Sequence, residues 1–136
     1  MAGYSGTPLA KKLGIKEGFN VRFVNAPDGL DKELDLPANV TVNSGARKPI
    51  DLVMLFVTTK SELERTFSNY AAKLTPAGML WISWPKKSSG VASDLSDNVV
   101  RELGLAKGMV DVKVCAVNEV WSGLKFVFRL KDRPKT

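Results

Sequence analysis

The chain has 136 residues, of which 44% are hydrophobic and 25% are charged, and its formal net charge is +6. This size and composition fit one folded domain that can bury a core of its own. The single cysteine, Cys115, excludes an intramolecular disulfide and a thiolate-based metal cluster; the lack of histidine excludes a Ser-His-Asp triad, a Cys-His pair and histidine-based zinc or iron sites. Any catalysis would have to use carboxylates, lysine, tyrosine or a cofactor.

Nothing in the sequence indicates a membrane or an export signal. The longest apolar run, Leu52–Val57, is far too short to span a bilayer. The first residues, Met1–Gly6, lack the charged and apolar succession of a signal peptide. We therefore expect no membrane partner and a cytoplasmic location.

The positive charge is concentrated near the C-terminus, where residues 131–136 form a short basic tail. The last dozen positions set five basic residues against one acidic residue: Lys125, Arg129, Lys131, Arg133 and Lys135 against Asp132. Such an excess favours an anionic partner, and a solvated tail that maintains solubility explains it as well. A nucleic-acid binder usually shows a denser basic stripe or a named motif, and neither is found here.

Short elements are predicted at the N-terminal end. Thr7 as N-cap, Pro8 at the first helical position and Gly14 as the closing residue predict a short helix. The elements expected after it are a strand, a short helix and a brief strand, over Asn20–Asn25, Leu30–Leu34 and Val40–Asn43.

The middle of the chain reads as a βαβ unit. Ile50–Val57 is apolar almost throughout, which is typical of a strand covered on both faces. A capping box over Ser61–Glu64 begins an amphipathic helix predicted for Ser61–Leu74. The second strand of the unit is expected at Gly78–Ser83.

A second helix and a hairpin complete the predicted fold. Ser96 caps a helix over Asp97–Lys107, and strands over Val110–Val117 and Gly123–Leu130 are joined by the turn Asn118–Ser122. This order predicts an α/β fold: a three-layer sandwich with a mostly parallel, Rossmann-like sheet and a C-terminal antiparallel hairpin, forming one domain over residues 1–130.

One connection conflicts with a parallel sheet. Only Ser44–Pro49 separates the brief strand from the βαβ unit, whereas a parallel crossover normally needs a dozen or more residues. Val40–Asn43 is therefore expected to be an antiparallel edge strand, or barely a strand at all.

The order of elements resembles a trimmed class I methyltransferase. In that fold a segment of the form D-x-V…L-x-P-x-G leads into the strand after the helix, and it stands here as Asp51-Leu52-Val53 and Leu74-Thr75-Pro76-Ala77-Gly78. The resemblance covers residues 50–129 and implies an S-adenosylmethionine-dependent enzyme. The chain departs from the family in its first loop, Asn25–Gly29, which has one glycine and a proline, and at Asn43, where the family has an acidic residue for the ribose.

A second resemblance covers nearly the whole chain. Three parts of the chain are similar to a family of small bacterial proteins of unknown function: Tyr4–Ala10, Trp84–Lys87 with Ser89–Val91, and Val114–Val117 with Trp121–Gly123. This resemblance implies a bacterial, soluble, Rossmann-like domain and supplies no activity.

The loop after the second strand of the βαβ unit is the main site candidate, because ligands of open α/β sheets bind outside the carboxyl ends of the strands. Its lysines can meet a phosphate or carboxylate, its serines can donate hydrogen bonds, and Gly90 permits a tight turn; Ser93 or Ser96 would add the free amides of the next helix. The order of glycine and lysine is not that of a Walker loop. A solvated surface loop is the alternative. The residues predicted to bind ligand are Trp84, Lys86, Lys87, Ser88, Ser89, Gly90 and Trp121.

Other residues are weaker candidates. Trp81 is expected to be structural, whereas Trp84 and Trp121 lie where strands end and could line a pocket. Glu119 is the carboxylate closest to the predicted site, and an exposed turn glutamate is the simpler interpretation. Cys115 has Lys113 on the same strand face, but no histidine is present to activate it.

Three functions are compatible with these observations. The first is a domain that binds a small anionic ligand or a protein partner at the carboxyl edge of the sheet, with Lys86 and Lys87 contacting the anion. The second is a divergent S-adenosylmethionine-dependent methyltransferase. The third is a weak nucleic-acid binder that uses the basic tail. The sequence names neither a cofactor nor a catalytic residue.

Overall fold

A computed structural model of the chain describes residues 8–30, 34–44 and 48–130. Within these residues no helix has the length and apolar character needed to cross a membrane. The helices and strands, in chain order, are α1 (Leu9–Leu13), β1 (Asn20–Val24), β2 (Thr41–Val42), β3 (Ile50–Phe56), α3 (Lys60–Ala71), β4 (Leu74–Pro85), the short 3-10 helix η1 (Lys87–Ser89), α4 (Asp97–Ala106), β5 (Met109–Ala116) and β6 (Trp121–Phe128).

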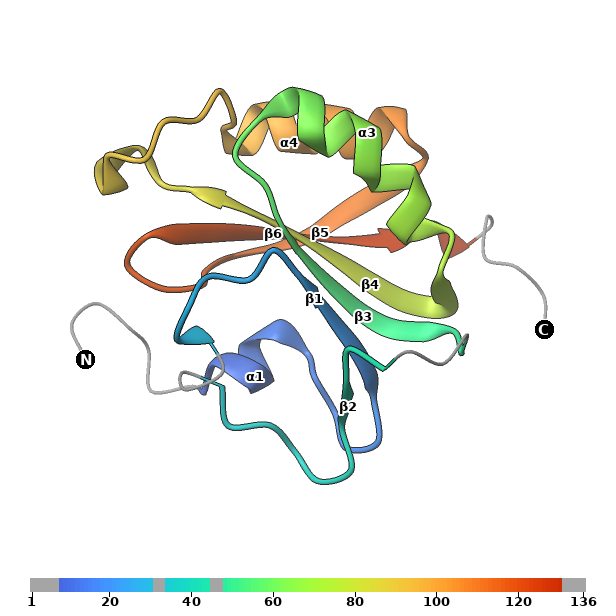
Figure 1. The fold of residues 1–136 in the computed structure, drawn as a ribbon. Coiled ribbons are helices and arrows are strands. Elements are labelled where there is room, and N and C mark those ends of the chain that lie inside the picture. The colour runs from blue at the N-terminus through green and yellow to red at the C-terminus, as the bar shows by residue number, and fades with distance from the viewer. Residues whose placement is uncertain (1–7, 31–33, 45–47, 131–136) are drawn as a thin grey trace.

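The six strands form one mixed sheet in the order β2-β1-β3-β4-β6-β5 (Figure 1). The pairs β1–β2, β1–β3 and β3–β4 are parallel. The pairs β4–β6 and β5–β6 are antiparallel, because the C-terminal hairpin places β6 between β4 and β5. The predicted mostly parallel sheet with a closing antiparallel hairpin is confirmed.

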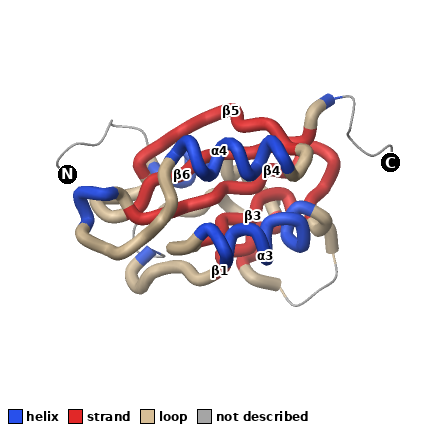
Figure 2. Tube along the Cα trace, turned by 90° about the horizontal axis from the view of Figure 1, so that it is seen from above, coloured by secondary structure: helices blue, strands red, loops and turns tan. Residues whose placement is uncertain are grey.

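Helices cover the two faces of the sheet unequally. Both long helices, α3 and α4, lie on one face, which we call the upper face, while α1 and the segment after β1 lie on the lower face (Figures 1 and 2). Under the long helices, Phe67 of α3 meets Phe126 of β6 edge to face at 5.5 Å. On the lower face, Leu13 of α1 packs into a second cluster with Trp81. The three-layer prediction is therefore confirmed.

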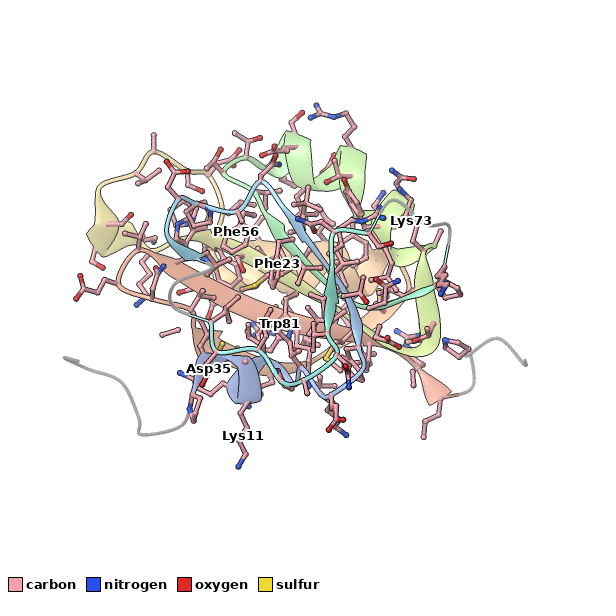
Figure 3. All side chains as sticks on the ribbon, turned by 60° about the horizontal axis from the view of Figure 1, so that its bottom comes forward. Lys11, Phe23, Asp35, Phe56, Lys73 and Trp81 are labelled. Carbon is pink, nitrogen blue, oxygen red and sulfur yellow. The ribbon has the colours of Figure 1, made fainter. Side chains whose placement is uncertain are left out.

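The short helix α1 is fastened to the lower face through its C-terminal end. The indole Nε1 of Trp81 donates a hydrogen bond to the carbonyl oxygen of Leu13 at 2.8 Å, and the Lys113 ammonium donates to the carbonyl oxygen of Lys12 at 3.0 Å. The last carbonyls of a helix have no partner within the helix, so the sheet provides one. Figure 3 shows Trp81 above α1, with Lys11 pointing away from the sheet.

The strand β2 corrects the expectation of an antiparallel edge strand. It contains only Thr41 and Val42, as the second alternative expected, but it pairs parallel to β1. The parallel arrangement is possible because β2 lies beside the beginning of β1: Thr41 is opposite Asn20, the first residue of that strand. The connection from β2 to β3 therefore spans only a short distance. The start of β3 is also close to Asn20, because the Asp51 carboxylate accepts a hydrogen bond from the Asn20 amide at 2.7 Å.

The helix caps differ from the predicted ones in two places. The capping residue of α3 lies two positions earlier than predicted: the Thr59 hydroxyl accepts from the Glu62 amide at 3.1 Å and the Glu62 carboxylate accepts from the Thr58 amide at 3.3 Å, so Ser61 is already helical. At α1, Pro8 is the N-cap residue rather than the first helical residue. The predicted cap Thr7 lies outside the described residues.

The second strand of the βαβ unit is longer than expected. The helix α3 ends at Ala71 and β4 already begins at Leu74, which pairs with Ile50, so residues 75–77, which lie between the predicted helix and the predicted strand, belong to the strand. A Cβ atom at Gly78 would lie 2.9 Å from the Thr75 carbonyl oxygen and 3.1 Å from that of Ile50. This position therefore requires glycine, and the irregular pairing there replaces a turn. Helix α4 begins after Ser96 as predicted.

Candidate ligand site at the carboxyl edge

The three parallel strands β1, β3 and β4 end at the same edge of the sheet. The chain passes from β1 to β2 on one side and returns to β3 on the other, so the order of strands reverses between β1 and β3. In open α/β sheets such a reversal marks the usual ligand crevice. The residues that follow the three strands there are Asn25, Val57 and Lys86.

The loop after β4 holds its lysines on a fixed backbone. The Lys86 amide donates to the Val120 carbonyl at 2.7 Å, and the Lys86 carbonyl accepts from both the amide and the hydroxyl of Ser89, at 3.0 and 2.6 Å. Lys87 is exposed and Lys86 is half-buried. Within the described residues neither ammonium group has an ion-pair or hydrogen-bond partner.

The predicted serines and glycine of this loop differ in what they offer a ligand. The Ser89 hydroxyl donates to Lys86 and accepts from the Val91 amide at 3.2 Å, so it stabilises the turn itself. Ser88 is exposed and its hydroxyl makes no hydrogen bond to a described residue. Gly90 has φ 79°, in the left-handed region that the predicted tight turn requires. Of the loop hydroxyls, Ser88 is the one available to a ligand.

The segment after this loop occupies part of two helix N-termini, those of α3 and of α4, and the second was expected to bind an anion. Asp94 accepts from the Lys60 amide at the start of α3 at 2.7 Å, and Ser96 accepts from the Val99 amide of α4 at 3.3 Å. Ser93 donates to the Thr58 carbonyl at 2.7 Å. The Ser93 bond attaches the segment to the residue range just after β3. The Asp94 and Ser96 bonds occupy backbone amides at the helix N-termini, so these amides are not available to an anion.

The two predicted pocket tryptophans lie on opposite faces of the sheet. Trp84 is buried in the upper core with Leu95 and Val100. Trp121 packs on the lower cluster, where its ring meets Phe56 edge to face at 5.1 Å. The structure therefore does not bring these two rings together, although each lies next to the edge that carries the lysine loop.

Two asparagines with left-handed backbones lie beside the switch point. Asn25 has φ 58° and follows β1, and its side-chain amide donates to the Phe56 carbonyl at 3.5 Å. Asn43 has φ 51° and follows β2, and its side-chain oxygen accepts from the Phe23 amide at 2.8 Å. Both side chains connect neighbouring strands. Asn43, which the sequence resemblance aligns with the ribose-binding carboxylate of methyltransferases, thus has its acceptor oxygen engaged.

One polar residue of this edge escaped the sequence reasoning. The Ser83 hydroxyl is fully buried, and among the described residues it is the buried side-chain polar atom without a hydrogen-bond partner. Its direct neighbours in the sheet are Phe56 and Gly123. A serine within the apolar run Leu80–Trp84 is the signal that could have identified it, because an orphaned buried hydroxyl is costly.

The remaining candidates have structural environments. Glu119 is exposed in the β5–β6 turn, where Asn118 organises the backbone by accepting from the Val120 and Trp121 amides. Cys115 is buried on the lower face; burial raises the pKa of its thiol, although three nearby lysines act in the opposite direction. Among the described residues no group of histidine, cysteine or carboxylate side chains is arranged to hold a metal ion.

A shallow groove lies between α3 and α4. Its volume is about 330 Å³ and its lining residues are Lys60, Glu64, Val99, Glu102, Leu103, Ala106 and Lys107. It contains none of the predicted ligand residues, and its walls carry charges of both signs.

No protein-family profile and no curated protein matches this chain in sequence. Solved structures do match its fold. A SAM-dependent methyltransferase from Aquifex aeolicus aligns with TM-score 0.58 and 14% identity over 87% of this chain and 86% of its own. The chain has the class I methyltransferase fold. Magnesium protoporphyrin IX methyltransferase from Synechocystis, solved with bound SAM, aligns with TM-score 0.59 and 11% identity over 89% of this chain and 74% of its own.

A third structure extends the similarity to an enzyme that acts on a protein. The ribosomal protein L11 methylase from Lactobacillus delbrueckii subsp. bulgaricus aligns with TM-score 0.58 and 9% identity, over 89% of this chain and 75% of its own. At these identities the likeness concerns the fold. The expected resemblance to class I methyltransferases is thereby confirmed at that level.

Proposed function

We propose that this chain is a binding domain of the methyltransferase fold, and that it holds a small anionic ligand at the carboxyl edge through Lys86 and Lys87. The observation that carries the proposal is the geometry of the lysine loop. Its backbone is fixed by hydrogen bonds to Val120 and within the turn, while both ammonium groups stand without counter-ions in the described structure. Lysines on an ordered backbone can bind phosphate or carboxylate without the entropy cost of ordering the loop itself.

Ser88 and Gly90 complete the proposed contact. The Ser88 hydroxyl is available to donate to an anion, and Gly90 turns the chain and leaves open space beside the loop, since no atom lies within 4 Å of a Cβ built there. Trp121 would contribute a half-buried ring beside the loop. Trp84 would act from within the core, by holding the end of β4 in place.

A melting-temperature screen identifies the ligand class. The panel contains S-adenosylmethionine, nucleotides, sugar phosphates and simple anions. A ligand present at a hundredfold excess over its dissociation constant stabilises the protein by about 2.7 kcal/mol, which raises the melting temperature by roughly 8 °C for a domain of this size.

A pair of double variants then tests the lysines. Lys86→Ala with Lys87→Ala should weaken binding of the best ligand about tenfold or more, because charge-assisted hydrogen bonds are lost. The matched control is Lys73→Ala with Lys107→Ala, which removes the same charge near the starts of β4 and β5, at the opposite edge of the sheet. Equal weakening by both variants, or no stabilising compound in the panel, would contradict the proposal.

A divergent methyltransferase is the second candidate, favoured by the fold it shares with the SAM-dependent enzymes above. Against it stand Pro27 in the first loop and the engaged Asn43 oxygen. Calorimetric titration with S-adenosylmethionine distinguishes the two: saturable heat supports the enzyme, and none at millimolar cofactor removes it.

The third candidate, nucleic-acid binding through the basic tail, concerns residues 131–136, which lie outside the described residues. It stays a prediction with a simple test. Binding should weaken steeply with salt and should be lost when the tail is deleted.

A further inference from the structure

Four lysines gather on the lower face of the sheet, away from the lysine loop. Lys12 belongs to α1, Lys16 follows it, and Lys113 and Lys125 lie directly opposite each other on β5 and β6. We call these four residues the basic cluster. Trp81 is the neighbour of Lys125 on β4 and lies four residues before Pro85, so the cluster is roughly 13 Å along the strand from the carboxyl edge.

Lys125 has an unusual position for a lysine. Its strand, β6, is flanked by β4 and β5, and the row across the lower face reads Met54, Trp81, Lys125, Lys113. Met54 and Trp81 are fully buried. The Lys125 ammonium has no ion-pair or hydrogen-bond partner among the described residues, and its nearest ring is Trp81, at 6.0 Å.

The electrostatics of Lys125 are unfavourable in the free protein. Burial lowers its pKa and the charge of Lys113 lowers it further; Cys115 acts in the opposite direction, and Lys16 adds a lesser lowering. Like charges directly opposite each other on neighbouring strands also destabilise a sheet. The protein thus maintains a partly desolvated cation beside two further cations, which a bound anion would stabilise.

The cluster is also preorganised. The Lys113 ammonium is positioned by its bond to the Lys12 carbonyl, and the Lys12 ammonium lies 3.4 Å from the Ala116 carbonyl. An ammonium group has three donors, so Lys113 retains two for a ligand. Gly14 brings the end of α1 close, since a Cβ atom there would lie 3.8 Å from Lys125 Nζ.

We propose that the basic cluster binds a compact oligophosphate chain, such as inorganic triphosphate or the phosphates of a nucleoside triphosphate. Several cations converge from α1, β5 and β6, which suits a ligand with several adjacent negative charges. Single-stranded nucleic acid fits less well, because it needs exposed aromatic rings on which its bases stack. The exposed large apolar residues of the described chain are Val42, Val91, Leu105, Val112, Val114 and Leu130, and none is aromatic.

Calorimetry with inorganic triphosphate at low salt tests this assignment on the full chain. Lys113→Ala with Lys125→Ala should weaken binding about tenfold or more. The double variant of Lys73 and Lys107 described above is the charge-matched control and should bind as the wild type does. The double variant of Lys86 and Lys87 should also retain binding, which separates this site from the proposed carboxyl-edge site.

Two single variants guard against a trivial loss of folding. Lys125→Met removes the partly buried charge, so it should raise the melting temperature of the free protein while it weakens triphosphate binding. Lys125→Arg keeps the charge and should retain binding. Absence of triphosphate binding to the wild type, or equal weakening by the control variant, would overturn the proposal. A short single-stranded RNA that binds the cluster more tightly than triphosphate would also overturn it, by assigning the cluster to nucleic acid.

Discussion

The attachment of α1 to the sheet gives a quantitative prediction for Trp81→Phe. Trp81 is fully buried, and its Nε1 is the donor that satisfies the Leu13 carbonyl at 2.8 Å. Phenylalanine keeps most of the ring but leaves that carbonyl without a partner, which costs about 1–3 kcal/mol. The smaller ring adds a cavity term of roughly 1 kcal/mol. We expect the free energy of unfolding to fall by about 2–4 kcal/mol.

Trp84→Phe is the matched control for this prediction. Trp84 is also buried and loses the same ring volume, but its indole donates no hydrogen bond within the described chain. Urea unfolding should therefore show a smaller loss for Trp84→Phe, by about 1–3 kcal/mol, at an unchanged m-value.

Hydrogen exchange localises the effect of Trp81→Phe. The amides of Lys12 and Ile15, which bond within α1 and its C-terminal turn, should exchange faster, while those of α3 change in proportion to global stability. Equal losses for the two tryptophan variants, or unchanged protection in α1, would refute the role assigned to the indole.

Three further predictions concern packing, capping and titration. Gly104→Ala should destabilise the protein by about 1–3 kcal/mol in urea unfolding despite the better helix propensity of alanine, because its Cβ would lie 2.1 Å from Phe126 Cε1. Thr59→Ala should cost about 1 kcal/mol and Ser61→Ala less than about 0.5 kcal/mol, since Thr59 caps α3; the reverse order in thermal unfolding would contradict this cap. The Cys115 thiol, whose pKa is raised chiefly by burial, should react with a thiol reagent at pH 8 only after unfolding. Because the pKa of this thiol is higher in the folded state, the stability that the protonated thiol contributes is present below the unfolded pKa of about 8.5 and is lost as pH rises through the folded pKa. Wild type should therefore lose stability relative to Cys115→Ala only at alkaline pH.

Periodicity predicted the sheet well where burial is complete. Ile50–Phe56 is apolar almost throughout because both of its faces are covered, and its strand was found within one residue. The hairpin of β5 and β6 was likewise predicted from the turn that joins the two strands. The capping residue was misplaced because Ser61 and Thr59 both precede a glutamate at suitable spacing, and only the backbone geometry decides between them.

The candidate site was predictable in place and less so in detail. A polar loop after a buried strand pointed to the carboxyl edge, and the sheet places it there. Sequence alternation could not tell which face Trp84 and Trp121 occupy, because that depends on the pairing of Pro85 with Trp121 across β4 and β6. The basic cluster was invisible for a related reason: Lys12 and Lys113 are 101 residues apart in sequence and meet only through the docking of α1.

The distribution of binding groups distinguishes this chain from the cofactor-binding arrangement of its fold. In a nucleotide-binding α/β sheet the first loop and the end of the second strand hold the cofactor. Here the second strand is only two residues long. Asn25 and Asn43 both have left-handed backbones, and their side chains form hydrogen bonds with the backbones of Phe56 and Phe23, which connects neighbouring strands. Lys86 and Lys87 lie instead after β4, and Lys125 lies on β6; none of these three ammonium groups has an ion-pair or hydrogen-bond partner among the described residues. Ligand chemistry in this chain should therefore be concentrated in the C-terminal half of the sheet, and variants there should change binding more than variants at the two asparagines, which should change stability first.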